Sequence, residues 1–113
     1  MLDSVVTVAL TSALDGLSMR QRAIADNIAN VNTPGYTAQR VKFEAALAES
    51  VNRRDGDVRA TTERSVEPTQ LNGNNVNLDT ETLSNIETVL RYQFAAHAVN
   101  SEFNSMRTVL KSQ

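Results

Sequence analysis

Cysteine and tryptophan are absent from this 113-residue chain, and aromatic residues make up only 4% of it. The absence of cysteine excludes disulfides, thiol catalysis and thiolate metal sites. Few aromatic side chains leave few large groups with which to build a compact core. We therefore expect the chain to complete its burial against other chains.

A long hydrophobic run and an excess of positive charge are also missing. No segment approaches the roughly 18 apolar residues that span a bilayer, so we expect no direct membrane insertion. The formal net charge is −2, and Lys and Arg are not clustered, which argues against nucleic-acid binding. Asp3 stands where a secretory signal needs a basic residue, so we expect no cleaved signal peptide.

Residues suited to catalysis or metal binding are few and scattered. His97 is the single histidine, so His and Cys ligands cannot form a metal site. The segment from Asn75 begins like a calcium loop, but Thr80 stands where that loop needs Gly and Ile86 where it needs Glu. No Gly-rich phosphate loop or nucleophile elbow is present. We expect no enzyme activity, no cofactor and no metal.

Helical periodicity dominates residues 5–31. Apolar side chains recur there at alternating intervals of four and three, interrupted once by the polar Gln21, which is the pattern of a helix that packs on another helix. These residues are Leu10, Leu14, Leu17, Ile24, Ile28 and Val31. Gly16 costs roughly 1 kcal/mol of helix propensity relative to Ala, so a close neighbour or a local bend is expected there.

An asparagine-rich segment ends this helix, running from Ala25 to Tyr36 as Ala-Asp-Asn-Ile-Ala-Asn-Val-Asn-Thr-Pro-Gly-Tyr. Asparagine suits a helix end because its amide bonds nearby backbone groups and tolerates left-handed conformations. Pro34 and Gly35 predict a type II turn that leads into Tyr36. A cap and a turn do not account for the density of amides.

The middle of the chain gives weaker signals. Phe43, Leu47 and Val51 are spaced by four and predict a short helix over residues 39–51. Residues 53–75 show no sustained period and contain several turn signals. We interpret them as an extended or mobile connection, in which a short hairpin stays open as an alternative.

A second long helix is expected from about Asp79 to Leu110, with Asn77 or Asp79 as its N-cap. It carries two offset apolar stripes. Leu83, Ile86 and Leu90 form the first, and the second consists of Val89, Tyr92, Ala96, Val99, Phe103, Met106 and Leu110. A hairpin of two helices covers only one stripe, so the second indicates assembly.

These elements predict an all-α fold in which the long terminal helices pair as a coiled-coil-like hairpin. The middle is expected to be mostly irregular and partly helical. We divide the chain into the N-terminal helix and turn (1–36), a variable connection with a short helix (37–76) and the C-terminal helix (77–113). The first and third parts would form one structural domain.

The order of these segments resembles the axial rod and hook proteins of the bacterial flagellum. The resemblance rests on the Asn-Ile-Ala-Asn and Thr-Pro-Gly-Tyr elements in 27–36 and on Asn-Gly-Asn-Asn-Val-Asn-Leu-Asp-Thr-Glu at 72–81. The second element is most similar to the FlgB family of proximal rod proteins rather than to its FlgC sibling. Thr82 departs from the Met expected after the Glu.

The resemblance implies a non-enzymatic subunit of the flagellar basal-body rod in the periplasmic space. Its terminal helices would pack with copies of itself and with rod proteins of the FlgC, FlgF and FlgG type into a torque-transmitting tube. The adaptor FliE and the inner-membrane ring would be further partners. Export would occur through the flagellar type III apparatus, and Phe43 and Leu47 resemble the signal that its gate recognises.

Within such an assembly we expect the interface to contain Leu10, Leu14, Leu17, Ile24, Asn27, Ile28, Asn30, Val89, Tyr92, Val99, Phe103, Met106 and Leu110. The amides of Asn27 and Asn30 would bond the backbone of a neighbouring subunit. Two alternatives stay open: a FlgC-like sibling rod protein, and a cytoplasmic coiled-coil adaptor unrelated to flagella, which would not explain the asparagine-rich segments.

Overall fold

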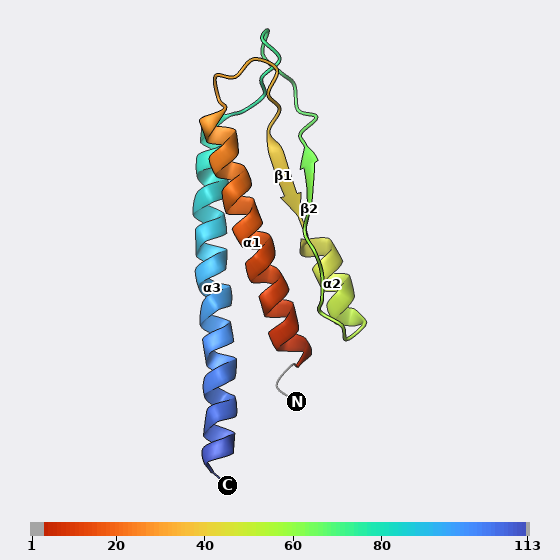
Figure 1. Ribbon diagram of the computed structural model, residues 1–113, viewed down its shortest axis with the longest axis vertical. Helices are drawn as coiled ribbons and strands as arrows, with labels where there is room; N and C mark the ends of the chain where they lie inside the picture. The colour runs from red at the N-terminus through yellow and green to blue at the C-terminus, as the bar shows by residue number, and fades with distance from the viewer. Residues whose placement is uncertain (1–3, 113) are drawn as a thin grey trace.

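The computed structural model describes residues 4–112. Its elements are α1 (Val5–Ala29), β1 (Gln39–Lys42), α2 (Glu44–Asn52), β2 (Thr61–Arg64) and α3 (Leu78–Lys111). Helices α1 and α3 run antiparallel along the long axis of a molecule that measures 67 × 25 × 14 Å (Figure 1). The expected pair of long terminal helices is confirmed, and the all-α description is correct except for a small two-stranded sheet.

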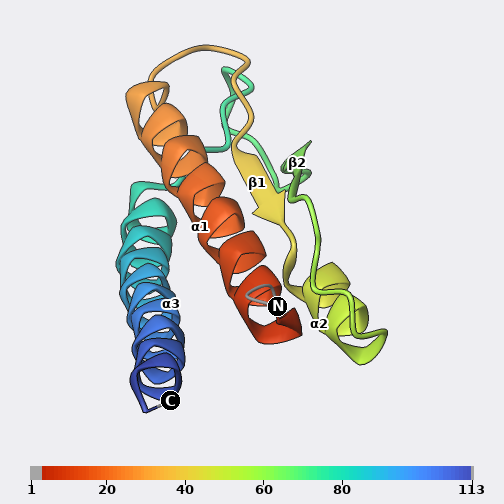
Figure 2. The ribbon, with the colours of Figure 1, turned by 60° about the horizontal axis from the view of Figure 1, so that its bottom comes forward.

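Helix α1 lies in the middle of the molecule. Helix α3 packs on one side of it, and the segment from β1 through β2 packs on the other, as both ribbon views show (Figures 1 and 2). We call this segment, residues 39–64, the arm. Because α1 has neighbours on two sides, much of its surface is used within the chain.

Capping residues set where the long helices begin. The Ser4 hydroxyl accepts a hydrogen bond from the backbone N–H of Thr7 at 3.1 Å. At α3, the Asn77 side chain accepts from the N–H groups of Asp79 and Thr80, so the first of the two proposed caps is correct. Each cap pairs N–H groups that have no partner inside the helix.

Residues 39–42 form a strand, so the predicted helix over 39–51 was wrong in its first turn. Strand β1 pairs antiparallel with β2, with Gln39 opposite Arg64 and Lys42 opposite Thr61. Val41 is buried and Lys42 is exposed, the alternation of a half-covered strand. The pairing partner lies about 20 residues away, in the region interpreted as irregular, so no local pattern revealed it.

The apolar core lies between α1 and the arm. Leu17 and Ala23 of α1 form a buried cluster with Val41 and Phe43 of the arm. A Cβ atom added at Gly16 would lie only 2.5 Å from a ring carbon of Phe43. The expected close neighbour at Gly16 is therefore confirmed, and the neighbour is an aromatic ring.

Helix α3 buries one face and exposes another. Towards α1 it buries Glu81, Thr88 and Ala95. A second face carries apolar side chains that are each more than half exposed, and we call it the outer stripe: Leu83, Ile86, Leu90 and Phe94. Among the described residues, no helix combines the length and the apolar character needed to cross a membrane.

Candidate functional site

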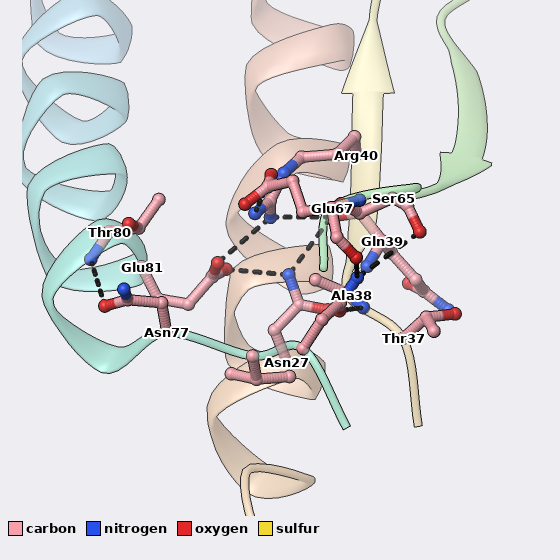
Figure 3. A network of polar contacts seen from close by, with 12 residues as sticks. Asn27, Thr37, Ala38, Gln39, Arg40, Ser65, Glu67, Asn77, Thr80 and Glu81 are labelled. Carbon is pink, nitrogen blue, oxygen red and sulfur yellow. Dashed lines mark hydrogen bonds and ion pairs between the residues drawn. The ribbon is translucent and has the colours of Figure 1, made fainter. Parts of the chain in front are cut away.

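The two asparagine-rich segments meet at the end of the molecule where α1 ends and α3 begins (Figure 3). Residues from α1, β1, α3 and the preceding loop come together there and are joined by side-chain hydrogen bonds. Its central members are Asn27, Arg40, Asn74, Asn75 and Glu81, and we call them the amide hub. This convergence accounts for the density of amides in the sequence.

Asn27 joins three elements with one side chain. Its amide nitrogen donates to the Glu81 carboxylate at 2.7 Å and to the Gln39 carbonyl at 3.0 Å. Its amide oxygen accepts from the Gln39 N–H at 2.8 Å and from the Tyr36 hydroxyl at 3.2 Å. The side chain thus uses two donor and two acceptor positions, its full capacity, and the residue is 0% exposed.

Glu81 is a buried carboxylate that bonds on both sides. One oxygen accepts from Asn27, and the other pairs with the Arg40 guanidinium at 2.9 Å. Arg40 also pairs with Glu67 at 3.3 Å. Glu81 also lies in the first turn of α3, where a carboxylate suits the positive end of the helix dipole. Its buried ion pair to β1 went unrecognised because Arg40 lies in a segment that shows no ionic pattern.

Asn74 and Asn75 fasten the loop before α3 to the end of α1. The Asn74 amide donates to the carbonyls of Asn30 and Thr33, each at 2.8 Å. The Asn75 amide oxygen accepts from the Ala38 N–H at 2.7 Å. Both residues are almost fully buried, so these amides replace the water that loop backbone normally binds.

The Pro-Gly turn has the geometry that its residues require. Gly35 has a φ of 76°, and the Tyr36 N–H donates to the Thr33 carbonyl at 3.2 Å, as in a type II turn. The Gly35 N–H donates to the Asn72 carbonyl at 2.8 Å. A Cβ at Gly73 would stand 3.2 Å from the Gly35 Cα, so the two glycines allow the loops to touch.

The amide hub joins structural elements to one another. Every buried side-chain nitrogen and oxygen of residues 4–112 has a hydrogen-bond partner. The same residues contain no group of three or more His, Cys, Asp or Glu side chains that could hold a metal ion. A fully bonded network holds elements in a fixed relation, and this one fixes α1, α3 and the arm.

The expected bonds of Asn27 and Asn30 to a neighbouring subunit stay a prediction, but both side chains already bond within the chain. Asn27 has no surface and no free bonding position to offer a neighbouring subunit. The Asn30 amide bonds the Asp26 carbonyl and the Thr33 hydroxyl, so it completes the helix end. The similarity of the two Asn-rich stretches was the one sequence signal that could have suggested that they meet.

A second polar cluster joins α1, α2 and α3 near the middle of the molecule. The Glu44 carboxylate pairs with Arg20 of α1, at 2.8 Å to one guanidinium nitrogen, and with Arg91 of α3 at 3.2 Å. Hydrogen bonds from Arg20 hold the pKa of the Glu44 carboxyl below its usual value, and Glu44 raises the pKa of Arg20 in return. We call these three residues the arginine clamp.

The expected interface residues fall into groups with different exposure. Leu17 and Ile24 are buried within the chain, as is Asn27, so they have almost no surface left for a neighbour. The residues that keep exposed or half-exposed surface are Leu10, Leu14, Ile28, Asn30, Val89, Tyr92, Val99, Phe103, Met106 and Leu110. Sequence periodicity identified helix-packing residues but could not separate contacts within the chain from contacts between chains.

Phe43 and Leu47, the expected export signal, lie on the arm. Phe43 is 5% exposed and belongs to the core, and Leu47 packs partly buried against the same cluster. The Arg20 guanidinium stacks 4.9 Å from the centre of the Phe43 ring. In the folded chain this pair therefore acts as a hydrophobic anchor.

Comparison with known proteins places these features in one family. Residues 9–37, which contain most of α1 and the Asn-rich turn, match the family model described as "Flagella basal body rod protein". The chain is 32% identical to the flagellar basal body rod protein FlgB of Bacillus subtilis (strain 168), over 89% of each chain. It is also 32% identical to FlgB of Escherichia coli (strain K12), over 88% of each. FlgB of Borrelia hermsii is 31% identical, over 87% of this chain and 90% of the relative.

Proposed function

Because the chain belongs to the FlgB family of flagellar basal body rod proteins, we propose that it is a structural subunit of the proximal rod. It would pack through α1 and α3 with other copies and with rod proteins of the FlgC, FlgF and FlgG type. Through the adaptor FliE it would connect the inner-membrane ring to the distal rod and transmit torque. Residues 1–36 and 77–113 would form the axial part, and 37–76 the outer part.

One observation carries the proposal of assembly through the helices. Helix α3 has two apolar faces, and α1 covers only one of them, along the part of α3 that lies beside it. The four side chains of the outer stripe remain in water, where each exposed apolar side chain costs about 1.5–3 kcal/mol relative to full burial. A contiguous exposed apolar stripe is typical of a protein interaction surface.

We further propose export through the flagellar type III apparatus, without a cleaved signal, into the periplasmic space. Phe43 and Leu47 would be recognised at the export gate. Since Phe43 is buried in the folded chain, only an unfolded chain could present this pair. Folding would then remove the signal once the subunit has passed the membrane.

Complementation of a strain that lacks this protein tests the assembly role. Leu83→Asp combined with Leu90→Asp should leave the isolated protein folded, since both side chains are already exposed, but should abolish rod formation and motility. Ser101→Asp combined with Ser105→Asp adds the same two charges on the exposed polar part of α3, so it is the matched control and should retain both. Normal basal bodies with the double variant would refute the assembly role of the stripe.

A further inference from the structure

The solvent-facing side of α3 changes character along its length. Its first part carries the outer stripe, and its later part carries small polar side chains that line an open groove: His97, Asn100, Ser101, Asn104, Ser105 and Thr108. A neighbouring helix that followed the whole face would have to bury these polar groups without partners. The apolar contact is therefore confined to the first part.

A second exposed apolar seam lies at the other end of α3, on the side that faces α1. Since Asn27 of α1 bonds Glu81 of α3, the beginning of α1 at Val5 is level with about Phe103. The last part of α3 extends past that level (Figure 1). We call Phe103, Met106 and Leu110 the end seam. Phe103 is 49% exposed and Leu110 is 66% exposed, because α1 no longer covers them.

The two seams match each other in spacing. The outer stripe begins with Leu83, Ile86 and Leu90, at intervals of three and four, and the end seam repeats those intervals. No seam position carries a charge. Helical seams with the same heptad spacing can pack side by side, with each side chain inserting between residues of the facing helix.

We propose, on the basis of the assembly role argued above, that the end seam of one copy packs on the outer stripe of a second copy. Leu83 of one chain would lie level with Phe103 of the other, Ile86 with Met106, and Leu90 with Leu110. The helices would run parallel with a displacement of about 20 residues, or about 30 Å. One contact of this kind covers the end seam and the first three residues of the outer stripe at once.

This arrangement differs from a closed dimer in a testable way. An outer stripe that paired with its own copy by two-fold symmetry would leave the end seam exposed. A contact between two different surfaces leaves one free surface of each kind on the pair. Further copies can then add at both ends, so the assembly grows as an open series of subunits. Open growth is what a subunit of an extended assembly requires.

Cysteine cross-linking distinguishes these geometries, because the natural chain contains no cysteine. A chain that carries both Ile86→Cys and Met106→Cys is treated with a short bis-maleimide, as purified protein at high concentration and within isolated basal bodies. The two cysteines of one chain would be about 30 Å apart along α3, so a short linker cannot join them. The proposal predicts a ladder of cross-linked oligomers.

The single variants Ile86→Cys and Met106→Cys should each show at least a tenfold loss of cross-linked product, and a mixture of the two should give dimers. Ile86→Cys with Ser101→Cys is the matched control pair and should stay at background. Efficient self-cross-linking of Ile86→Cys alone would overturn the proposal in favour of a closed dimer. Product between Met106→Cys and Leu71→Cys would instead indicate end-to-end stacking.

Failure of this contact can be separated from failure of the proposed function. If the double-cysteine chain is present in basal bodies but gives no ladder there, the subunit role stands and the contact is wrong. If the chain is absent from basal bodies while purified protein still forms the ladder, the contact stands and the rod role is wrong. Far-UV circular dichroism of each variant should match that of the natural chain.

Discussion

Asn27 holds three elements in place through four hydrogen bonds, so its replacement should lower the stability of the isolated chain. Asn27→Leu removes the partner of one oxygen of the buried Glu81 carboxylate, whose other oxygen stays paired with Arg40, and the partner of the Gln39 N–H. Loss of one partner of a buried charged group costs on the order of 3 kcal/mol. Urea unfolding followed by circular dichroism should show a loss of about this size.

Asn30→Ala is the matched control for this change. The Asn30 side chain bonds only its own helix end and turn, so its loss should cost about 1 kcal/mol or less. Equal destabilisation by the two variants would contradict the distinction drawn between a hub residue and a cap residue. A fully stable Asn27→Leu monomer that fails to build rods would instead support a direct role of Asn27 between subunits.

Glu44 makes the arginine clamp sensitive to acid. Hydrogen bonds from Arg20 lower the pKa of Glu44 in the folded chain, so the ionised carboxylate stabilises the fold. This stabilisation is fully present above the pKa of Glu44 in the unfolded chain, near 4.5. The effect is lost as the pH falls through the lower, folded value. Glu44→Gln should cost on the order of 1 kcal/mol at pH 7, since Glu44 is 45% exposed and solvent screens the pairs.

Unfolding of the natural chain and of Glu44→Gln across pH 7 to 3 checks this prediction. The difference in stability should shrink below pH 4.5 and vanish once Glu44 is protonated. Lys42→Gln at an exposed pair with Glu63 serves as a control, because that pair lies outside the clamp. A difference that persists at pH 3 would show that the Glu44→Gln effect comes from packing and not from charge.

Gly16 of α1 lies against Phe43 of the arm, so a test of this contact involves both elements. Gly16→Ala gains about 1 kcal/mol of helix propensity, but its Cβ would meet the Phe43 ring at 2.5 Å. Overpacking of this kind costs about 1–3 kcal/mol, so the variant should be destabilised overall. The destabilisation is steric, and it should disappear when the Phe43 ring is removed.

A double-mutant cycle with Phe43→Leu isolates that steric term. In the Phe43→Leu background the same Gly16→Ala change should be neutral or stabilising, because the shorter side chain leaves room for the methyl group. Thermal unfolding of the four proteins gives the coupling energy. Additive effects would show that the ring yields easily and that Gly16 serves another purpose.

The export signal is tested by comparing two residues of the same core. Phe43→Ala removes the proposed signal and a core side chain, and Val41→Ala removes a core side chain two positions away. If the gate recognises Phe43, secretion should fall at least tenfold for Phe43→Ala and remain near normal for Val41→Ala. Secretion by a strain that lacks the later rod parts provides the measurement. An equal fall for both would mean that the signal lies elsewhere.

At the scale of elements, the sequence predicted what depends on local periodicity. The ends of α1 and α3 lie within about two residues of the predicted ends, because apolar spacing and capping residues are local signals. Strand β1 could not be predicted in this way. Its partner β2 is exposed along its length and carries no apolar alternation, so only the tertiary pairing defines it.

The hub illustrates the same limit at the level of single contacts. The Asn-rich segments were identified as unusual, yet their residues are about 40 positions apart and bond each other only once the helices pair. Arg40 and Glu67 were not selected at all, because isolated charges in a loop have no distinguishing pattern. The hydrogen bonds between these segments therefore depend on the tertiary fold and not on any local sequence pattern.

The whole molecule is elongated, and its stability should differ between its two ends. The amide hub and the core hold α1, the arm and the first half of α3, whereas the last part of α3 extends past α1. Helical segments without tertiary partners are marginal in water. We therefore expect residues 104–111 to unfold locally in the isolated chain and to become ordered on incorporation.

Hydrogen exchange measured by mass spectrometry tests this last prediction. In the isolated chain, amides of residues 104–111 should exchange at least a hundredfold faster than those of 84–99, since local opening there does not disrupt the core. In assembled rods the two segments should be protected to a similar degree. Strong protection of residues 104–111 in dilute, monomeric protein would mean that α3 is stable without a neighbour. The free energy gained on incorporation would then come from the outer stripe and not from ordering of the helix end.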